Sequence, residues 1–236
     1  MLCVQKRKAF TIVELLVVVA IIALLVGIMV PAVRGALDRA KDLAVKTQLA
    51  SISTGLELFK SDYDEYPDSS DLVRPGAQVL CDSLLGPELR GTIDPHTGQQ
   101  RNPYVKQEGI EFMPWPTVSP TSYVMKGKWG HAILYYRATP GAMLATYAID
   151  QIYDADDNAS SIPDFSDRND DPLADGTDFY NCITNMQIGN PADLNAAAPF
   201  NAESFILISA GKDGIYGNED DIASFDRKGV IPELSF

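Results

Sequence analysis

The sequence is short of positive charge. Its 236 residues carry 19 Lys and Arg against 32 Asp and Glu, which gives a formal net charge of −13. Lys6, Arg7 and Lys8 stand in a segment without acids, so the rest of the chain sums to −16 once these three are set aside. Because a polyanion needs a basic footprint, this composition argues against a nucleic-acid partner. It suits a solvated surface or the binding of cations.

Histidine is scarce as well, which limits the available catalytic chemistry. The two histidines are His96, in a DPHTG turn, and His131, beside the turn at Trp129 and Gly130. Both are interpreted as surface or packing residues. No nucleophile elbow, phosphate-binding glycine loop or paired His and Cys metal motif occurs in the sequence. The chain is therefore predicted not to be an enzyme.

Only three cysteines are present, and Cys3 lies in the short N-terminal segment. A bridge between the other two, Cys81 and Cys182, would close a loop of about 100 residues and constrain the unfolded chain by about 4 to 5 kcal/mol. Nothing in the sequence shows that the two residues approach each other. The sequence is compatible both with a disulfide between Cys81 and Cys182 and with two buried thiols.

One long apolar run follows the basic cluster. From Leu15 to Val33 there are 19 residues without a charge, which span about 28 Å as a helix, close to one hydrocarbon thickness. The preceding cations predict a cytoplasmic N-terminal flank and an external bulk of the chain. A cleaved secretory signal is the alternative, but the run is long for one and no A-x-A site follows it.

The helical pattern continues beyond the apolar run. After Pro31 the apolar residues recur at steps of three and four, with charged residues on the opposite face. Helix breakers do not accumulate until Pro67. The sequence therefore predicts one helix from about Phe10 to about Asp62, kinked or loosened at Pro31.

The sequence after this predicted helix has shorter apolar runs. Residues 132–139, 143–149 and 204–209 are rich in β-branched and aromatic residues and predict strands, the first two as a hairpin. Residues 150–178 hold ten aspartates and one basic residue, Arg168. That segment predicts a long solvated loop that contributes nothing to the core.

These features predict an α+β fold, in which a long N-terminal helix, half of it transmembrane, packs on a small antiparallel β-sheet. The expected regions are a basic N-terminal segment at 1–9, the transmembrane half of the helix at 10–33, its outer half at 34–66 and a globular domain at 67–236.

The N-terminal stretch KAFTIVELLVVVAIIALLVGIMVPAV resembles the class III leader and first helix of type IV pilins and type II secretion pseudopilins. In that family a membrane peptidase cuts a short basic leader before a Phe and methylates the new N-terminus. The resemblance implies that Ala9 precedes the cut, that Phe10 becomes the N-terminus and that Glu14 is the family's acidic fifth residue. Ala9 stands where the family prefers Gly. Pro31 falls at the family's helix-loosening proline.

Glu14 is the charge that needs a partner. A carboxylate at the apolar end of a membrane-spanning helix is costly unless it is paired. Cleavage before Phe10 would create an ammonium group in the same membrane layer. Glu14 of one subunit is therefore expected to pair with the Phe10 amine of its neighbour and so to favour assembly. The alternative is that Glu14 snorkels to the lipid interface.

A second informative stretch is ISAGKDGIYGNEDDI, residues 208–222, which sets aspartates among glycines after a predicted strand. Glycine permits left-handed backbone, and calcium takes six to eight oxygen ligands. On composition alone, a calcium loop and a simple Asp-Gly turn are both open. The stretch resembles the C-terminal calcium loop of the major pseudopilin. The ligands implied by position are the carboxylates of Asp213, Asp220 and Asp221 and backbone carbonyls near Ala210 and Asn218.

Two further segments are similar to the same family, LELFKSDYDEYPDS after the helix and GKWGHAILYYR before a strand. The family usually has Asp-Pro before that Trp, where this chain has Gly127 and Lys128. The acidic DADDN, residues 154–158, lacks the glycine and the distal Glu of a known calcium loop and is predicted to be a solvated insertion.

The resemblance implies a structural subunit of a periplasmic pseudopilus in type II secretion, with calcium as cofactor. The expected partners are copies of itself, other pseudopilins, the prepilin peptidase and the inner-membrane assembly platform. It would cross the bacterial inner membrane once, with a cytoplasmic N-terminus and a periplasmic globular domain. A minor or surface type IV pilin with an adhesive or tip role is the alternative.

Overall fold

The computed structural model divides into two compact units, residues 1–41 and 42–236, and each is described by itself. The residues that the structure describes are 11–70, 74–94, 97–114, 122–141, 152–158, 179, 182–189, 197–217 and 220–225.

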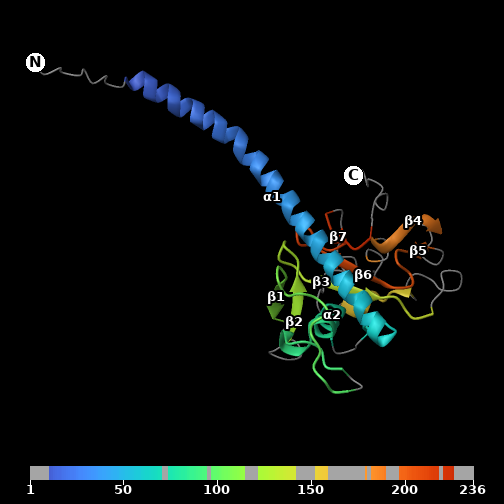
Figure 1. Cartoon of the computed structure of the whole chain (residues 1–236). Helices are drawn as coiled ribbons and strands as arrows, with labels where there is room; N and C mark the ends of the chain where they lie inside the picture. Colours follow the sequence, from blue (N-terminus) through green and yellow to red (C-terminus); the bar gives the residue numbers. More distant parts are fainter. Residues whose placement is uncertain are drawn as a thin grey trace, which may run out of the picture. The chain divides into compact units, whose positions relative to one another are not determined.

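Helix α1 (Ile12–Tyr63) is one continuous α-helix, which confirms the predicted long helix (Figure 1). Pro31 lies inside it, with helix on both sides. Over residues 12–33 the large apolar side chains are at least 43% exposed. This stretch is long and apolar enough to cross a membrane by length and composition, and none of its apolar window is buried within the protein.

The second half of α1 has a single buried face. Val45, Leu49, Ile52 and Leu56 are at most 2% exposed and lie three or four residues apart, which places them on one side of the helix. They belong to the same core cluster as four buried residues of α2 (Gly76–Leu85), which are Leu80, Cys81, Leu84 and Leu85. From this point α1 behaves as an amphipathic helix of a folded domain.

In the part of the chain that the structure describes, the remaining elements are short, and their strands form three antiparallel sheets. Their order after α2 is η1 (Pro87–Leu89), β1 (Glu111–Pro114), β2 (Tyr123–Lys126), β3 (Ile133–Arg137), η2 (Ala155–Asn158), β4 (Thr184–Gly189), β5 (Ala197–Pro199), β6 (Phe205–Ser209) and β7 (Ile222–Ala223). The sheets are β1-β2, β3-β6-β7 and β4-β5. Two predicted strands are confirmed as β3 and β6, and with them the α+β class. The third, at 143–149, and its hairpin lie outside the described residues.

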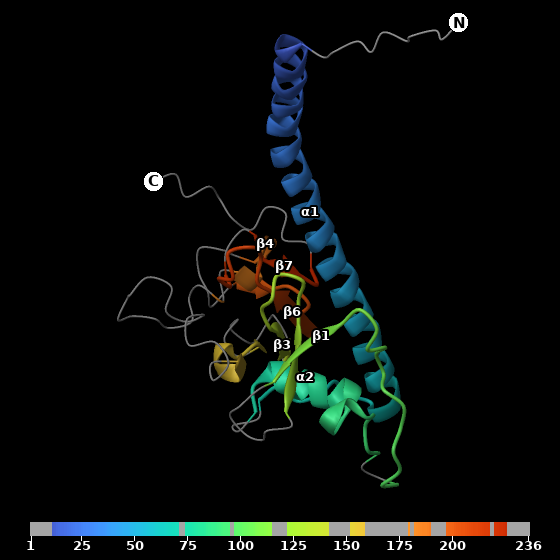
Figure 2. The same cartoon turned by 90° about the vertical axis from the view of Figure 1, so that its left-hand side faces the viewer.

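The β3-β6-β7 sheet is covered on both faces. On one face, Ile133, Tyr135 and Leu207 contact the core cluster formed with α1 and α2. On the other face, Leu134, Tyr136 and Ile206 join a second cluster. Its other members include Ile152, Tyr153, Phe179, Cys182 and Ile183. Helix α2 also packs against β2 and β3 (Figure 2). Burial on both faces explains why β3 and β6 are almost continuously apolar instead of alternating.

The prediction that residues 150–178 contribute nothing to the core is wrong at the start of that segment. Ile152 and Tyr153 are fully buried, and η2 follows with Asn158 2% and Asp157 9% exposed. The apolar pair covers the second face of the sheet. The prediction missed these two residues because it used the average composition of the segment, which does not show whether individual apolar residues are buried. Residues 159–178 lie outside the described residues.

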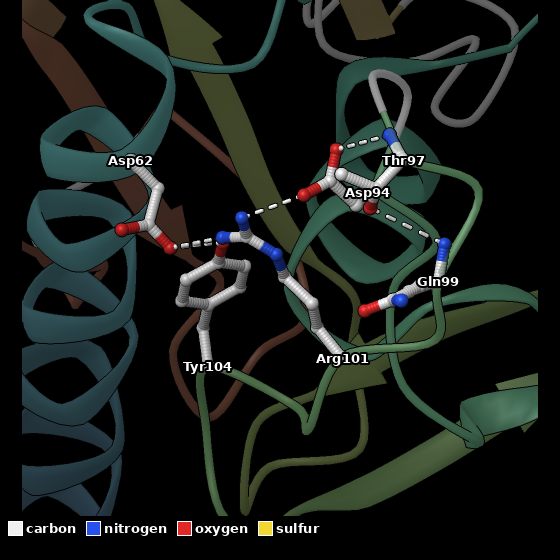
Figure 3. A network of polar contacts seen from close by, with 6 residues as sticks. All are labelled: Asp62, Asp94, Thr97, Gln99, Arg101 and Tyr104. Carbon is white, nitrogen blue, oxygen red and sulfur yellow. Dashed lines mark hydrogen bonds and ion pairs between the residues drawn. The ribbon is translucent and has the colours of Figure 1, made fainter.

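An arginine fixes the connection between α2 and β1 to the end of α1 (Figure 3). The guanidinium of Arg101 contacts Asp62 of α1 at 2.7 Å and Asp94 at 2.6 Å. The Asp94 side chain is only 5% exposed, and it also accepts the backbone N–H of Thr97 at 3.2 Å. Tyr104 donates its hydroxyl to Asp62 at 2.8 Å. Arg101 thus balances a buried carboxylate while it holds the connection against α1.

The buried face of α1 makes a direct stability prediction. Leu56→Ala should lower the free energy of unfolding of the detergent-solubilised full chain by about 2–5 kcal/mol, because it leaves a cavity in the core. Leu58→Ala is the matched control, since Leu58 lies on the same helix and is 51% exposed. This variant should change the free energy of unfolding by less than about 0.5 kcal/mol. Urea unfolding followed by circular dichroism measures both. Equal losses in the two variants would contradict the packing of α1.

Candidate functional site

The N-terminal site begins at the first turn of α1. Ala9 and Phe10 lie outside the described residues. Glu14 accepts two hydrogen bonds at the same carboxylate oxygen, from the backbone N–H of Thr11 at 2.9 Å and from its hydroxyl at 2.8 Å. In return the backbone N–H of Glu14 donates to the Thr11 hydroxyl at 3.2 Å. This reciprocal pattern is a capping box.

The capping box gives Glu14 a partner within its own chain. The sequence reasoning missed it, although the Thr-x-x-Glu spacing ahead of an apolar run is its signature. The two hydrogen bonds satisfy one oxygen of a fully exposed carboxylate. A cation from another subunit would therefore add to, or exchange with, contacts that Glu14 already makes.

The second site is the connection from β6 to β7, which contains the predicted calcium ligands. Strands β6 and β7 pair antiparallel, with Ser209 opposite Ile222, so the intervening residues form one closed loop. Gly214 and Gly217 have φ angles of 79° and 88°, in the left-handed region that favours glycine. A Cβ atom at Gly211 would collide with the carbonyl and carboxylate of Asp220.

The aspartates of this loop accept hydrogen bonds from its own backbone. Asp213 accepts the N–H of Ile215 at 2.9 Å, and Asp220 accepts the N–H of Asp213 at 3.2 Å. Asp221, which is 8% exposed, accepts the N–H of Gly217 at 2.6 Å. The contact from Asp213 to the residue two positions on is the Asp-Gly turn considered above.

The predicted ligands are thus gathered in one loop but not assembled as a metal centre. Ala210 is fully buried, Asp213 and Asp220 are exposed, and Asn218 lies outside the described residues. Among the residues that the structure describes, no group of three or more His, Cys, Asp or Glu could hold a metal ion. In the described arrangement of the loop, the carboxylates of Asp213, Asp220 and Asp221 accept backbone N–H groups and do not converge on one point.

The loop is anchored on the segment before β3. The hydroxyl of Tyr216 donates to the carbonyl of Ala132 at 2.5 Å. Burial, followed by the charge of Asp221, raises the pKa of Tyr216, which keeps that hydroxyl protonated. The imidazole of His131 lies against Gly214, where a Cβ atom would collide with it. This confirms His131 as a packing residue, whereas His96 lies outside the described residues.

The Trp-Gly turn connects the same region to α1. The indole N–H of Trp129 donates to Asp42 at 2.8 Å, and the side-chain amide of Gln48 donates to the carbonyl of Lys126 at 3.1 Å. A Cβ atom at Gly127 would collide with the hydroxyl of Ser209. Sequence reasoning did not identify Asp42 or Gln48, because their partners lie 87 and 78 residues away.

Cys81 and Cys182 are both buried thiols. They belong to different core clusters, Cys81 to the one with α1 and Cys182 to the one on the opposite face of the sheet. Burial, with a smaller contribution from the Asp82 charge, raises the pKa of the Cys81 thiol. Of the two alternatives, the structure contains buried thiols and not a bridge.

Comparisons with known proteins agree with the N-terminal motif. Residues 4–30 match the prokaryotic N-terminal methylation motif. Type II secretion system core protein G of Pseudomonas aeruginosa is 26% identical over 138 residues, which cover 58% of this chain and 87% of that protein. The core protein G of Klebsiella michiganensis is 30% identical over 87 residues, and that of Vibrio cholerae is 28% identical over 86.

The two shorter alignments cover 36% of this chain and 58% and 56% of the Klebsiella and Vibrio proteins, so the chain spans just over half of their length. No solved structure gives a significant match. The long apolar helix, the methylation motif and the small antiparallel sheets define a type IV pilin-like protein. Within that class the chain is similar to type II secretion system core protein G, and its first helix is long and apolar enough to cross a membrane.

The state of the cysteines can be measured by counting thiols. A chain that has lost its leader, and Cys3 with it, should react with two equivalents of a thiol reagent after denaturation without reductant. The folded chain should react slowly, because Cys81 and Cys182 are 1% and 3% exposed. A denatured chain that shows no reactive thiol until it is reduced would establish the bridge instead.

Proposed function

We propose that this protein is a structural subunit of the pseudopilus of a type II secretion system. The observation that carries the proposal is the exposed apolar half of α1, most of which lies within the methylation motif of residues 4–30. The similarity to core protein G over 87% of the Pseudomonas protein supports the same assignment. The role is assembly and not catalysis.

In this proposal the prepilin peptidase cuts between Ala9 and Phe10 and methylates the new amine. The globular domain lies in the periplasm, because the cations that precede α1 favour the cytoplasm. Copies of the chain then polymerise from the inner membrane with other pseudopilins on an assembly platform. The α1 helices bury their apolar halves against lipid and against one another.

Glu14 supplies the charge that selects the assembled state. Its own capping box satisfies it in the single chain. A neighbour's Phe10 amine offers a full positive charge in the same apolar layer, where an ion pair is stronger than in water. A minor or surface pilin is the less favoured role, because the curated relatives reported above are all core protein G.

Replacing Glu14 with an uncharged residue tests its proposed pairing with the Phe10 amine. Glu14→Leu should still insert into the membrane but should reduce filament number at least tenfold, because the ion pair that favours assembly is lost. Electron microscopy of cells that overproduce the protein counts the filaments. Glu203→Gln, which removes an exposed acid of the globular domain, is the control and should assemble normally.

Mass spectrometry of the mature protein separates a failure of processing from a failure of assembly. Both variants are expected to begin with methylated Phe10. If Glu14→Leu is processed in this way and forms normal filaments, the pairing of Glu14 with Phe10 is wrong.

We also propose that calcium binds the loop between β6 and β7. The support is the density of carboxylates in a closed loop, Asp213, Asp220 and Asp221, with glycines that free the backbone to turn carbonyls inward. Because these carboxylates accept backbone N–H groups in the described structure, calcium binding would rearrange the loop. Asp213 and Asp220 are the ligands most accessible to an entering ion.

Calcium removal tests this proposal. Excess chelator should lower the melting temperature of the wild-type full chain by several degrees, since a ligand at about 100 times its Kd stabilises the folded state by about 2.7 kcal/mol. Asp213→Asn should lose most of this response, whereas Glu203→Gln should keep it. An unchanged melting temperature and filament number on chelation would leave the Asp-Gly turn as the whole role of the loop.

A further inference from the structure

The short helix η2 lies within an acidic segment and is nevertheless attached to the core (gold in Figure 2). It packs against α2 and β3. Two of its four side chains, Asp157 and Asn158, are buried, while Asp156 is exposed. Buried polar side chains in such a short element need specific partners.

Asn158 attaches η2 to α2 and β3. Its side-chain oxygen accepts the backbone N–H of Ala77 at 2.8 Å, and its side-chain nitrogen donates to the carbonyl of Tyr135 at 2.9 Å. Pro75, the N-cap residue of α2, makes no side-chain capping bond. Asn158 therefore satisfies one of the orphan N–H groups at the start of α2 from a distant part of the chain.

Asp157 makes the adjacent attachment through a serine. Its carboxylate accepts the hydroxyl of Ser69 at 2.5 Å. The same Ser69 oxygen accepts the backbone N–H of Arg137 in β3 at 2.9 Å. One carboxylate thus joins η2, the connection after α1 and strand β3.

The charges that act on Asp157 are of its own sign. Asp154 and Asp156 belong to its own segment, and Asp68 lies beside Ser69 on the connection after α1. The pKa of Asp157 is raised to about 7, chiefly by burial and further by the three neighbouring acids, while the hydrogen bond from the Ser69 hydroxyl acts in the opposite direction. Ser69, a neutral donor, offers no positive charge to oppose them.

Among the residues that the structure describes, no cation contributes to the pKa shift of Asp157. On β3 the guanidinium of Arg137 pairs with Glu65 at 3.0 Å. The phenol of Tyr136 is fully buried, and its pKa is raised well above the usual value by burial, so it stays neutral. From α2, η2 receives the backbone N–H of Ala77.

We propose that Asp157 is a proton-controlled latch, which holds η2 on the core when it is protonated and loosens η2 when it ionises. The direction follows from linkage. An undocked aspartate has a pKa of about 3.9, so the docked state retains a proton that the undocked state has lost. Docking therefore weakens as pH rises from about 4 to about 7, by up to about tenfold per pH unit, and stays weak above that range.

We expect the loosening of η2 to leave Ile152 and Tyr153 in place. Ile152 and Tyr153 are fully buried, and Tyr153 donates its hydroxyl to the carbonyl of Asn201 at 2.6 Å. The carbonyl of Ile152 accepts the backbone N–H of Thr139 at 2.8 Å. These contacts contain no group that titrates near neutral pH, so the N–H of Thr139 is an internal reference.

The test is amide hydrogen exchange on the full chain in detergent micelles, with calcium absent, at pH 5.5, 6.5 and 7.5 and corrected for intrinsic rates. Protection of peptides that contain Ala77 and η2 should fall at least tenfold from pH 5.5 to 7.5, while the peptide that contains Thr139 should not change. Wild-type protection that is flat over this range would overturn the latch.

Variants assign the effect to one carboxyl group. Asp157→Asn should abolish the pH dependence. Asp156→Asn should keep it but move its midpoint to lower pH, because one repelling charge is gone. Glu108→Gln, which removes an exposed acid elsewhere, should behave as wild type. A wild-type profile in Asp157→Asn overturns the proposal. If Asp157→Asn does not fold, the test rests on the pH midpoint of protection in the other two variants. Equal midpoints in Asp156→Asn and Glu108→Gln would then overturn the proposal.

Discussion

The apolar first half of α1 is the constraint on which the rest of this protein depends. Its large side chains stay exposed in the single chain, and a helix that is apolar on every side cannot remain in water. Lipid or other copies of the helix must cover it. The same helix becomes amphipathic from Val45 onward, where one face joins the core. One element thus serves first as an anchor and then as the framework of a folded domain.

The folded domain is built on a sheet with no solvent face. Helices α1 and α2 cover one side, and residues around Tyr153, Phe179 and Ile183 cover the other. Part of the segment after β3 is therefore a component of the core, because without it Leu134, Tyr136 and Ile206 would be open to water.

Polar contacts connect the loop between β6 and β7 to α1 in short steps. Tyr216 binds the segment before β3, and the Trp129 turn in that segment binds Asp42 of α1. A ligand that reorders the loop would act on this turn through a few close contacts. Within the globular domain, the loop and the outer half of α1 are thus mechanically linked.

The sequence by itself determined the elements whose signals are local. The helical period predicted α1 almost to its last residue, and the dense β-branched and aromatic runs predicted β3 and β6. The exposed charge at Glu14 was evident in the same way, and its capping box with Thr11 could have been found from their spacing.

The tertiary structure decided what depends on distant partners. The burial of Ile152 and Tyr153 requires a second sheet face, Arg101 meets Asp62 from 39 residues away, and Asp157 meets Ser69 from 88. Local patterns record which side chains avoid water, but not which surfaces will cover them. Such pairings depend on the packing of remote segments and not on local propensity.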